Sequence, residues 1–562
     1  MDNFLDKLLA SVAPDLPEAI AGLHVDKKIE LLAEKLNADV NGAYEWLSNA
    51  TQMPFQPKFT VSQGVTSILP EKLILEYSCL PIDLGEGQKQ GLVFGWPPDG
   101  NMKKWIKASS TKDFQYCLGP AADIRKFINE RFGVGAGSFL DGAADGVGLV
   151  EKKEVEQEDE DAVVIKFVNE LIKQALRDRA TDIHFEPQKN SLQIRYRIDG
   201  ALVPVSLPPN LVLFQSAIIS RLKIMAKLNI SEKRRPQDGR IAFRSGDTSI
   251  DIRVSTLPIT HGESISLRLL NLGEAPVQLE KMGLGEKEFD QVVNAITRPH
   301  GIVLVTGPTG SGKSTMLNAC IRKIEDPEIR IITVEDPVEY EIAGINQCQV
   351  QSDIGMTFAS ALRSILRQDP DVVMIGEIRD SETADIAIRA SITGHLVLST
   401  LHTNDAAGAV SRLCDMGLEP FLLASSLQLV IAQRLVRRIC PHCATKANYT
   451  PEQLDYALRA LRVHNHKDEL QFLDKIMVGK GCDKCKNGFK GRLAVHEILV
   501  ISDKIQQCII KNAPAREIRR IAISEGMRTL QECAWDHVKK GETTLDEVMQ
   551  FADKNNMDDE ES

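Results

Sequence analysis

A glycine-rich segment, Gly307-Pro-Thr-Gly-Ser-Gly-Lys-Ser-Thr315, has the residue types and spacing that bind a nucleotide phosphate. It fits the pattern G-x-x-x-x-G-K-[ST], in which glycines let backbone N–H groups turn inward around an anion. Lys313 is placed to reach the β- and γ-phosphates, and the Ser314 hydroxyl is placed to ligate Mg²⁺. We therefore predict that ATP and Mg²⁺ bind through Gly307, Pro308, Thr309, Gly310, Ser311, Gly312, Lys313, Ser314 and Thr315.

The residues around this loop favour a nucleotide site over the alternative, a plain glycine-rich turn. A strand-like run at 302–306 precedes the loop, and a helical run at 316–324 follows it. A helix that starts at the loop adds its positive N-terminal end to the phosphate site.

Acidic residues follow two further apolar, strand-like runs. The first run ends in Glu335, Asp336 and Glu339, and the second ends in Glu377. Because ligands of parallel sheets bind at the carboxyl ends of the strands, both groups should face the phosphate loop. One acid must lie near Mg²⁺, which suits Glu377, and another must orient the attacking water. The second role stays open among Glu335, Asp336 and Glu339, and helix capping is the alternative for all of these acids.

Two histidines, His395 and His402, bracket the next strand-like run, residues 396–400. A histidine that ends a strand beside a nucleotide loop can sense the γ-phosphate through a hydrogen bond. A structural role is the alternative for either residue.

Two Cys-x-x-Cys pairs supply a second kind of chemistry. Cys440, Cys443, Cys482 and Cys485 offer four thiolates, which is typical of a closed, tetrahedral, structural Zn²⁺ site. Free buried thiols are the alternative.

Length and composition indicate what kind of protein carries these groups. The 562 residues suggest about three to four domains, and the 43% hydrophobic content is that of a folded protein. A net charge of −11 argues against a dedicated nucleic-acid binder. The sequence contains no apolar run of about 18 residues and does not start like a signal peptide, which predicts a cytoplasmic protein.

Changes in periodicity and composition predict the domain organisation. Residues 73–77 and 91–95 are expected to be strands, and 121–132 a helix. The predicted parts are an N-terminal helical segment (1–57), an α/β interaction domain (58–136), an acidic flexible linker (137–161), an α+β domain (162–272), a connector (273–285) and an α/β ATPase domain (286–562) that includes a zinc subdomain (436–492) and C-terminal helices.

The α+β domain carries Arg253 and Arg268 on separate strand-like runs. Arginines on exposed strand faces are mostly solvated or paired with carboxylates, so neither residue alone indicates a function.

Four motifs in a fixed order resemble the type II secretion and type IV pilus assembly ATPases. They are the phosphate loop 307–315, an aspartate box at 333–339, a variant Walker B at 376–380 and a histidine box that ends at 402–404. The resemblance runs from about residue 160 to 550, and more weakly over 60–135. It implies a RecA-like P-loop core, preceded by a PAS-like α+β domain.

The resemblance also assigns roles to individual residues. It implies that Glu377 replaces the usual Walker B aspartate and that Glu339 polarises the attacking water. The cationic partners of the γ-phosphate would be Arg253, Arg268, Arg363 and Arg379. A planar guanidinium suits this role because it stabilises spread phosphoryl charge.

Members of this family work as homo-hexamers that move an inner-membrane platform protein, so the resemblance implies such partners, a cytoplasmic-side adaptor and recruitment to the inner membrane. The tetracysteine insertion favours pilus or pseudopilus assembly over retraction. We find no RLGxxL-type repeat, so a cyclic dinucleotide ligand is not expected. Two other functions remain open: a DNA-translocating P-loop motor and a nucleotide-gated scaffold that does not hydrolyse ATP.

Overall fold

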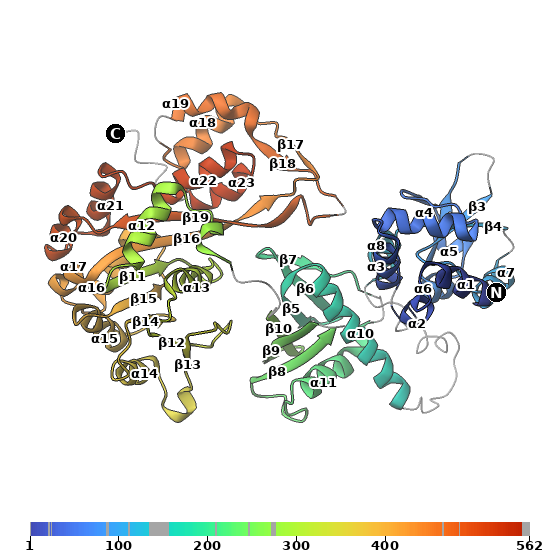
Figure 1. Cartoon of the computed structure of the whole chain (residues 1–562), viewed down its shortest axis with the longest axis horizontal. Helices are drawn as coiled ribbons and strands as arrows, with labels where there is room; N and C mark the ends of the chain where they lie inside the picture. Colours follow the sequence, from blue (N-terminus) through green and yellow to red (C-terminus); the bar gives the residue numbers. More distant parts are fainter. Residues whose placement is uncertain are drawn as a thin grey trace. The chain divides into compact units, whose positions relative to one another are not determined.

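A computed structural model describes residues 2–20, 23, 25–85, 89–110, 113–133, 157–207, 211–245, 248–270, 277–463, 466–482 and 484–552. The chain divides into two compact units, Met1–Asn271 and Leu272–Ser562 (Figure 1). This division falls just before the predicted connector 273–285. Of the predicted linker, residues 137–156 lie outside the described part of the chain.

The first part of unit 1 combines helices with a four-stranded sheet of order β1-β2-β3-β4. Leu32 and Leu47 from the helices belong to the same hydrophobic core as Ile82 and Val93 from the strands, so the segments on either side of residue 57 pack together. The elements are α1 (Asp2–Val12), α2 (Leu16–Ile20), α3 (Val25–Leu36), α4 (Val40–Thr51), β1 (Thr60–Val61), α5 (Val65–Ile68), α6 (Glu71–Tyr77), β2 (Cys79–Asp83), β3 (Gln90–Phe94), α7 (Gly100–Ser109), β4 (Phe114–Leu118) and α8 (Ala121–Phe132).

The strand predicted at 73–77 is wrong, because these residues belong to helix α6. Pro70 caps the start of this helix and Glu71 lies in its first turn, and both are start signals that outweigh the β-like composition of the run. The strand expected at 91–95 and the helix expected at 121–132 are confirmed as β3 and α8.

The second part of unit 1 is an α+β fold with a six-stranded antiparallel sheet of order β7-β6-β5-β10-β9-β8. Alternate strand residues such as Ile252 and Leu267 form a core with Phe167 of α10, so Arg253 and Arg268 lie on the opposite face. The elements are α10 (Gln157–Arg177), β5 (Ala180–Pro187), β6 (Leu192–Ile198), β7 (Ala201–Pro204), η2 (Leu211–Phe214), α11 (Gln215–Met225), β8 (Gln237–Ser245), β9 (Thr248–Ile259) and β10 (Gly262–Leu270).

Helix α10 begins at Gln157, so the linker predicted to end at residue 161 ends earlier. The helix can continue to this residue because each residue added to an existing helix gains a backbone hydrogen bond.

Unit 2 is built on a seven-stranded sheet of order β13-β12-β14-β15-β11-β16-β19, in which only the β16–β19 pair is antiparallel. Alternate residues of β11 enter two separate hydrophobic clusters, Ile302 in one and Val303 in the other, so the sheet is buried on both faces. The strands are β11 (Gly301–Thr306), β12 (Ile331–Glu335), β13 (Asn346–Gln349), β14 (Val372–Ile375), β15 (Leu396–Leu401), β16 (Leu427–Ile439) and β19 (Phe489–Val500). The α/β fold with a parallel sheet, predicted for residues 286–562, is confirmed.

Helices cover this sheet, and a small subdomain is inserted between β16 and β19, next to the labels β17 and β18 in Figure 1. The covering elements are η3 (Leu279–Lys281), α12 (Glu286–Ile296), α13 (Lys313–Ile324), η4 (Ser352–Ile354), α14 (Phe358–Ile365), α15 (Ser381–Ile392), α16 (Ala406–Asp415) and α17 (Pro420–Ser426). The insertion contains β17 (Ala444–Lys446), α18 (Pro451–Ala460), α19 (His466–Glu469), η5 (Leu470–Lys475) and β18 (Met477–Gly479).

The C-terminal helices are tied to the sheet by a buried carboxylate on β19. Glu497 accepts N–H bonds from Ala406 (2.9 Å) and Leu530 (3.3 Å), the first residues of α16 and α22, so it caps both helices. These helices are α20 (Asp503–Ile510), α21 (Ala515–Ser524), α22 (Leu530–Lys539) and α23 (Leu545–Val548), followed by η6 (Met549–Phe551). None of the described helices in either unit is long and apolar enough to cross a membrane.

Candidate functional site

The phosphate loop connects β11 to α13 and requires glycine at two positions. Gly307 and Gly312 have φ angles of 147° and 86°, which L side chains rarely adopt. A Cβ atom on Gly307 would lie 2.4 Å from the Gln433 carbonyl oxygen, and one on Gly312 would lie 2.7 Å from Gln433 Nε2. The loop therefore closes tightly over strand β16, and only glycine fits there.

Lys313 is buried inside this loop. Its Nζ donates to the carbonyl oxygens of Gly307 (2.8 Å) and Pro308 (3.1 Å). Burial lowers the pKa of Lys313, and the nearby Glu377 carboxylate partly opposes this shift. The ammonium thus sits within the loop on neutral oxygens, which phosphate oxygens can replace.

The loop after β15 is fixed beside the phosphate loop by two threonines. Thr306 Oγ1 lies 2.8 Å from Thr403 Oγ1 and accepts the Thr403 N–H at 2.9 Å. Because β11 and β15 pair in parallel, with Thr306 opposite Leu401, His402 follows at the same edge of the sheet.

Glu377 gathers three of the predicted residues into one cluster. Arg379 donates to its Oε1, and His402 Nε2 lies 3.1 Å from its Oε2. Arg379 also pairs with Asp336 at 3.4 Å. Burial acts to raise the pKa of Glu377, but Arg379 and His402 outweigh it and hold the pKa below its usual value. Glu377 is therefore ionised at neutral pH.

The two glutamates that bracket Asp336 differ in what they contact. Glu335 is buried and accepts hydrogen bonds from Thr333 of the same strand (2.7 Å) and from Gln347 of β13 (2.9 Å). Glu339 lies half-buried in the loop after β12, and the described part of the chain offers it no hydrogen bond or ion pair. Of the two, Glu339 is the one whose carboxylate is available to a water molecule.

The remaining predicted residues of unit 2 bond to partners outside this cluster. Arg363, on α14, pairs with Glu382 at 2.5 Å. His395 precedes β15 at the amino end of the strand, where its Nδ1 lies 3.0 Å from the Ala390 carbonyl oxygen. The strand thus separates His395 from His402, and only His402 faces the phosphate loop.

The arginines of unit 1 lie in one row across the sheet. Arg268 is directly opposite Arg253, and Arg253 is directly opposite Arg240. Arg268 pairs with Asp182 at 3.1 Å, and Arg240 pairs loosely with Asp251 at 3.9 Å. Asp182 and Asp251 therefore offset part of the positive charge of this row.

The four cysteines converge on one centre. Their Sγ atoms all lie within 4.8 Å of one another, and three pairs are 3.6 to 3.8 Å apart. A tetrahedral zinc with Zn–S bonds of about 2.3 Å requires sulfurs about 3.8 Å apart. The residues therefore fit a closed tetrathiolate zinc site.

Gln433 is a site residue that the sequence motifs do not include. Its Nε2 donates to the carbonyl oxygen of Ser311 at 2.8 Å, beneath the phosphate loop. The available signal was a glutamine that directly follows the apolar run 429–432, because buried polar groups are kept for a hydrogen bond.

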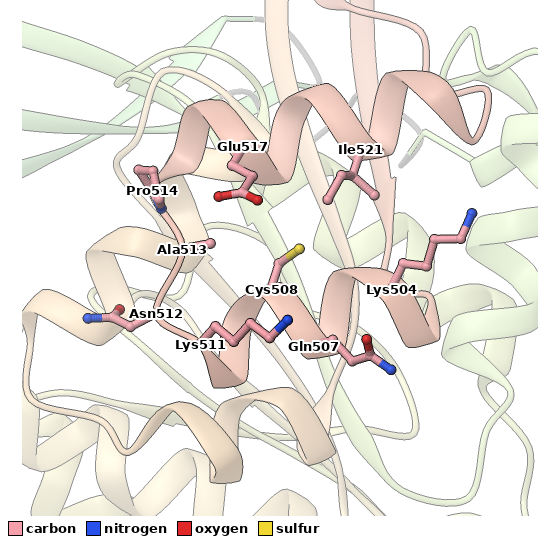
Figure 2. Close-up of a pocket in the computed structure, with 9 residues that line it drawn as sticks. All are labelled: Lys504, Gln507, Cys508, Lys511, Asn512, Ala513, Pro514, Glu517 and Ile521. Atoms are coloured by element: carbon pink, nitrogen blue, oxygen red, sulfur yellow. The ribbon is translucent and has the colours of Figure 1, made fainter.

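A groove of about 450 Å³ lies elsewhere in unit 2, between α20 and α21. Figure 2 shows Glu517 and Ile521 pointing from α21 toward α20, which contributes Lys504 and Gln507, and Lys511 directly follows this helix. None of its lining residues belongs to the predicted nucleotide or metal motifs, so the groove is separate from both sites.

The fold and the site together define a class of protein. A parallel sheet carries a phosphate loop after β11 and a carboxylate after β14, with β15 between these two strands, as in P-loop nucleotide hydrolases of the additional-strand group. The sequence pattern of the family described as "Type II/IV secretion system protein" matches residues 157–550.

Individual relatives agree with this match. The chain is 44% identical over 499 residues to the type IV pilus assembly ATPase PilB of Thermus thermophilus, which covers 86% of this chain and 54% of that protein. It therefore spans about half the length of that relative. It is 49% identical over 389 residues to the type II secretion system protein HxcR of Pseudomonas aeruginosa, covering 69% of this chain and 77% of HxcR.

A solved structure supports the fold alone. The ATPase DotB of Legionella pneumophila has a TM-score of 0.50 and 22% identity, over 68% of this chain and 94% of DotB. The chain belongs to the type II secretion and type IV pilus assembly ATPases, which confirms the resemblance inferred from the four motifs.

Proposed function

We propose that this protein hydrolyses ATP with Mg²⁺ and uses the energy to assemble a type IV pilus or a type II secretion pseudopilus. The observation that carries the proposal is the convergence of Lys313, Glu377 and His402 at the carboxyl edge of one parallel sheet, in a chain of this family. Both groups needed for phosphoryl transfer to water, an anion cradle and ionised carboxylates, are present.

Each residue of the edge has a distinct task. Lys313 exchanges its two carbonyl partners for phosphate oxygens, and the backbone of 307–315 cradles the phosphates. Mg²⁺, when bound, would neutralise phosphate charge and would be held by Ser314 and Glu377. His402 reports the γ-phosphate through its bond to Glu377.

Glu339 is the carboxylate that orients the attacking water. The hydrogen bonds of Glu335 to Thr333 and Gln347 support this choice, because they commit that carboxylate to the sheet. Asp336 acts through Arg379, which it helps to hold against Glu377.

Arginines complete the charge around the γ-phosphate. Arg253 and Arg268 of the α+β domain, which we take to be PAS-like, supply positive charge. They act on ATP of the same chain or of a neighbouring subunit in a homo-hexamer. Arg363 and Arg379 supply positive charge from the motor unit, and both now pair with glutamates that a nucleotide can replace as partners.

The mechanical output is movement of an inner-membrane platform protein, with a cytoplasmic-side adaptor on the N-terminal part. Pilus assembly is the favoured system, because the 499-residue match to the Thermus pilus protein extends beyond 157–550 into the N-terminal part. The match to the type II secretion protein spans only 389 residues. The tetracysteine centre holds structural Zn²⁺ and takes no part in the chemistry.

ATP turnover by the full chain tests this proposal. Wild-type protein should hydrolyse ATP only with Mg²⁺, and Lys313→Ala should lower the rate more than tenfold, equivalent to about 1.4 kcal/mol of barrier. Unchanged turnover in Lys313→Ala would remove the site assignment. Turnover that depends on added DNA would instead support a DNA-translocating motor, and ADP binding without turnover would support a nucleotide-gated scaffold.

A further inference from the structure

Strand β16 continues past the end of β11 and runs under the phosphate loop. The last residue of β11, Thr306, lies opposite Ala432, so the next residue of β16, Gln433, has no strand partner on that side. The loop occupies this space instead, and the Gln433 side chain donates to the Ser311 carbonyl at 2.8 Å.

Gln433 also explains why two of the loop residues are glycines. The close approaches to Gly307 and Gly312 are made by the Gln433 carbonyl oxygen and by its Nε2, respectively. Three residues of the loop, Gly307, Ser311 and Gly312, therefore pack against Gln433. A loop whose N–H groups must all face a phosphate needs such a support, because a few tenths of an ångström decide each hydrogen bond.

A histidine on the neighbouring strand lies beside this glutamine. Gln433 and His496 are directly opposite in the antiparallel β16–β19 pair, which places their side chains on the same face. His496 is buried, and burial together with His537 lowers its pKa to about 3. Its imidazole is therefore neutral at physiological pH and offers one donor and one acceptor.

These three neighbouring residues each have a buried polar atom without a hydrogen-bond partner among the described residues: Ser311 Oγ, Gln433 Oε1 and His496 Nε2. Gln433 and His496 are only 1% and 5% exposed. Native proteins seldom leave buried polar atoms unsatisfied, so a cluster of three marks a place whose bonding is completed in another state of the protein. Of the three residues, Ser311 belongs to the predicted phosphate loop.

We propose that Gln433 and His496 are positioning residues that form a polar floor under the phosphate loop and set its affinity for nucleotide. Gln433 fixes the Ser311 carbonyl from below. On nucleotide binding, the Ser311 hydroxyl donates to Gln433 Oε1, and His496 supports the amide from the next strand. This inference rests on the proposed ATP site and adds residues that no phosphate contacts.

The nucleotide affinity of full-length variants tests the role of Gln433 and His496 beneath the phosphate loop. Gln433→Leu removes the amide, and we expect the dissociation constant for Mg²⁺-ADP to rise about tenfold, the effect of one hydrogen bond. Gln433→Glu should weaken binding further, because it loses the donor and places a carboxylate beside the phosphates. His496→Phe should weaken binding by about threefold, and its effect should not add to that of Gln433→Leu.

The kinetic signature separates positioning from a loss of fold. Loop contacts act on bound ATP and on the transition state alike, so KM for ATP should rise with the ADP dissociation constant while kcat changes less than about threefold. The melting temperature without nucleotide should stay near that of wild type, whereas the stabilisation by ADP should shrink. If Gln433→Leu does not fold, Gln433→Met keeps the length of the side chain and takes its place.

Gln428 provides a matched control at the start of the same strand. It accepts a hydrogen bond from Arg298, away from the phosphate loop, so Gln428→Leu should leave ADP affinity unchanged. Wild-type affinity in Gln433→Leu, or an equal loss in Gln428→Leu, would overturn the inference while ATP turnover by wild type keeps the proposed function. Absence of ADP binding and turnover in wild type would instead reject the proposed function itself.

Discussion

The carboxyl edge of the sheet and the tetracysteine centre both belong to unit 2, but they hold their polar groups in opposite ways. At the edge, Lys313 rests on two backbone carbonyls, and Glu377 is shared between Arg379 and His402. In the tetracysteine centre, four sulfurs are spaced for one ion and leave no further ligand position.

The difference shows what each region can do. Partners at the edge can be exchanged for phosphate oxygens, which allows binding, turnover and release in a cycle. The tetrathiolate geometry is complete, so its binding energy stabilises the fold of the segment it joins. We therefore propose that the edge is the centre of chemistry and that the cysteine centre is a structural support.

The largest effect is expected outside unit 2. Arg253→Ala and Arg268→Ala should each lower kcat roughly 1000-fold, the usual value of an arginine that stabilises phosphoryl charge, and should retain ADP binding. Arg195→Ala is the control, since Arg195 lies on the same sheet but pairs with Glu186 through two hydrogen bonds. Normal turnover in both variants would show that the edge needs no charge from unit 1.

Removal of the edge carboxylate comes next. Glu377→Gln keeps the shape but loses the charge that faces Mg²⁺, so turnover should fall more than tenfold, or about 1.4 kcal/mol. Glu280→Gln, which loses an ion pair to Lys323, should leave turnover unchanged. Steady-state ATPase assays measure both variants. A Glu377→Gln rate equal to that of the control would contradict the role of Glu377.

The tetracysteine centre should respond in the opposite way. Cys443→Ser should lower thermal stability and loosen residues 436–492, while ADP affinity stays near that of wild type, because the four thiolates hold structure alone. Metal analysis should give about one zinc per wild-type chain, and Cys414→Ser, outside the cluster, should retain it. Zinc-free protein with a protease-resistant 436–492 segment would refute the assignment.

The last effect concerns stability at acidic pH and leaves turnover at neutral pH aside. His496 has a pKa of about 3 in the folded protein, well below the value of about 6.5 in an unfolded chain. The unfolded chain therefore binds a proton below pH 6.5 that the folded protein does not, so stability falls as pH decreases from about 6.5 toward 3. His496→Phe should flatten this part of the stability profile measured by urea unfolding, whereas the exposed His261→Ala should not.

The sequence allowed prediction of those parts of the site that lie within contiguous motifs. Residues 307–315 specify their loop locally, because glycines at fixed spacing leave few other conformations. The strands that precede Glu335 and Glu377 were found from apolar runs alone, and parallel pairing then brought their ends together.

Features that depend on packing between distant segments could not be predicted. Gln433 supports the loop from more than a hundred residues away, and no local pattern states which strand will lie beneath Ser311. The commitment of Glu335 to Gln347 likewise appears only once β12 and β13 pair. Residues 73–77 were mistaken for a strand because their apolar content outweighed the helix-start signal of Pro70 and Glu71.

Hydrogen exchange of the full chain, with and without Mg²⁺-ADP, tests the contrast between the two regions most directly. Amide protection should increase in four segments of the edge, because bound phosphate reduces their local opening. These segments are residues 307–316, 335–339, 376–380 and 402–404. Residues 436–492 should be unchanged by nucleotide and should lose protection when a chelator removes zinc. Protection of 436–492 by nucleotide, with none at 307–316, would contradict the account.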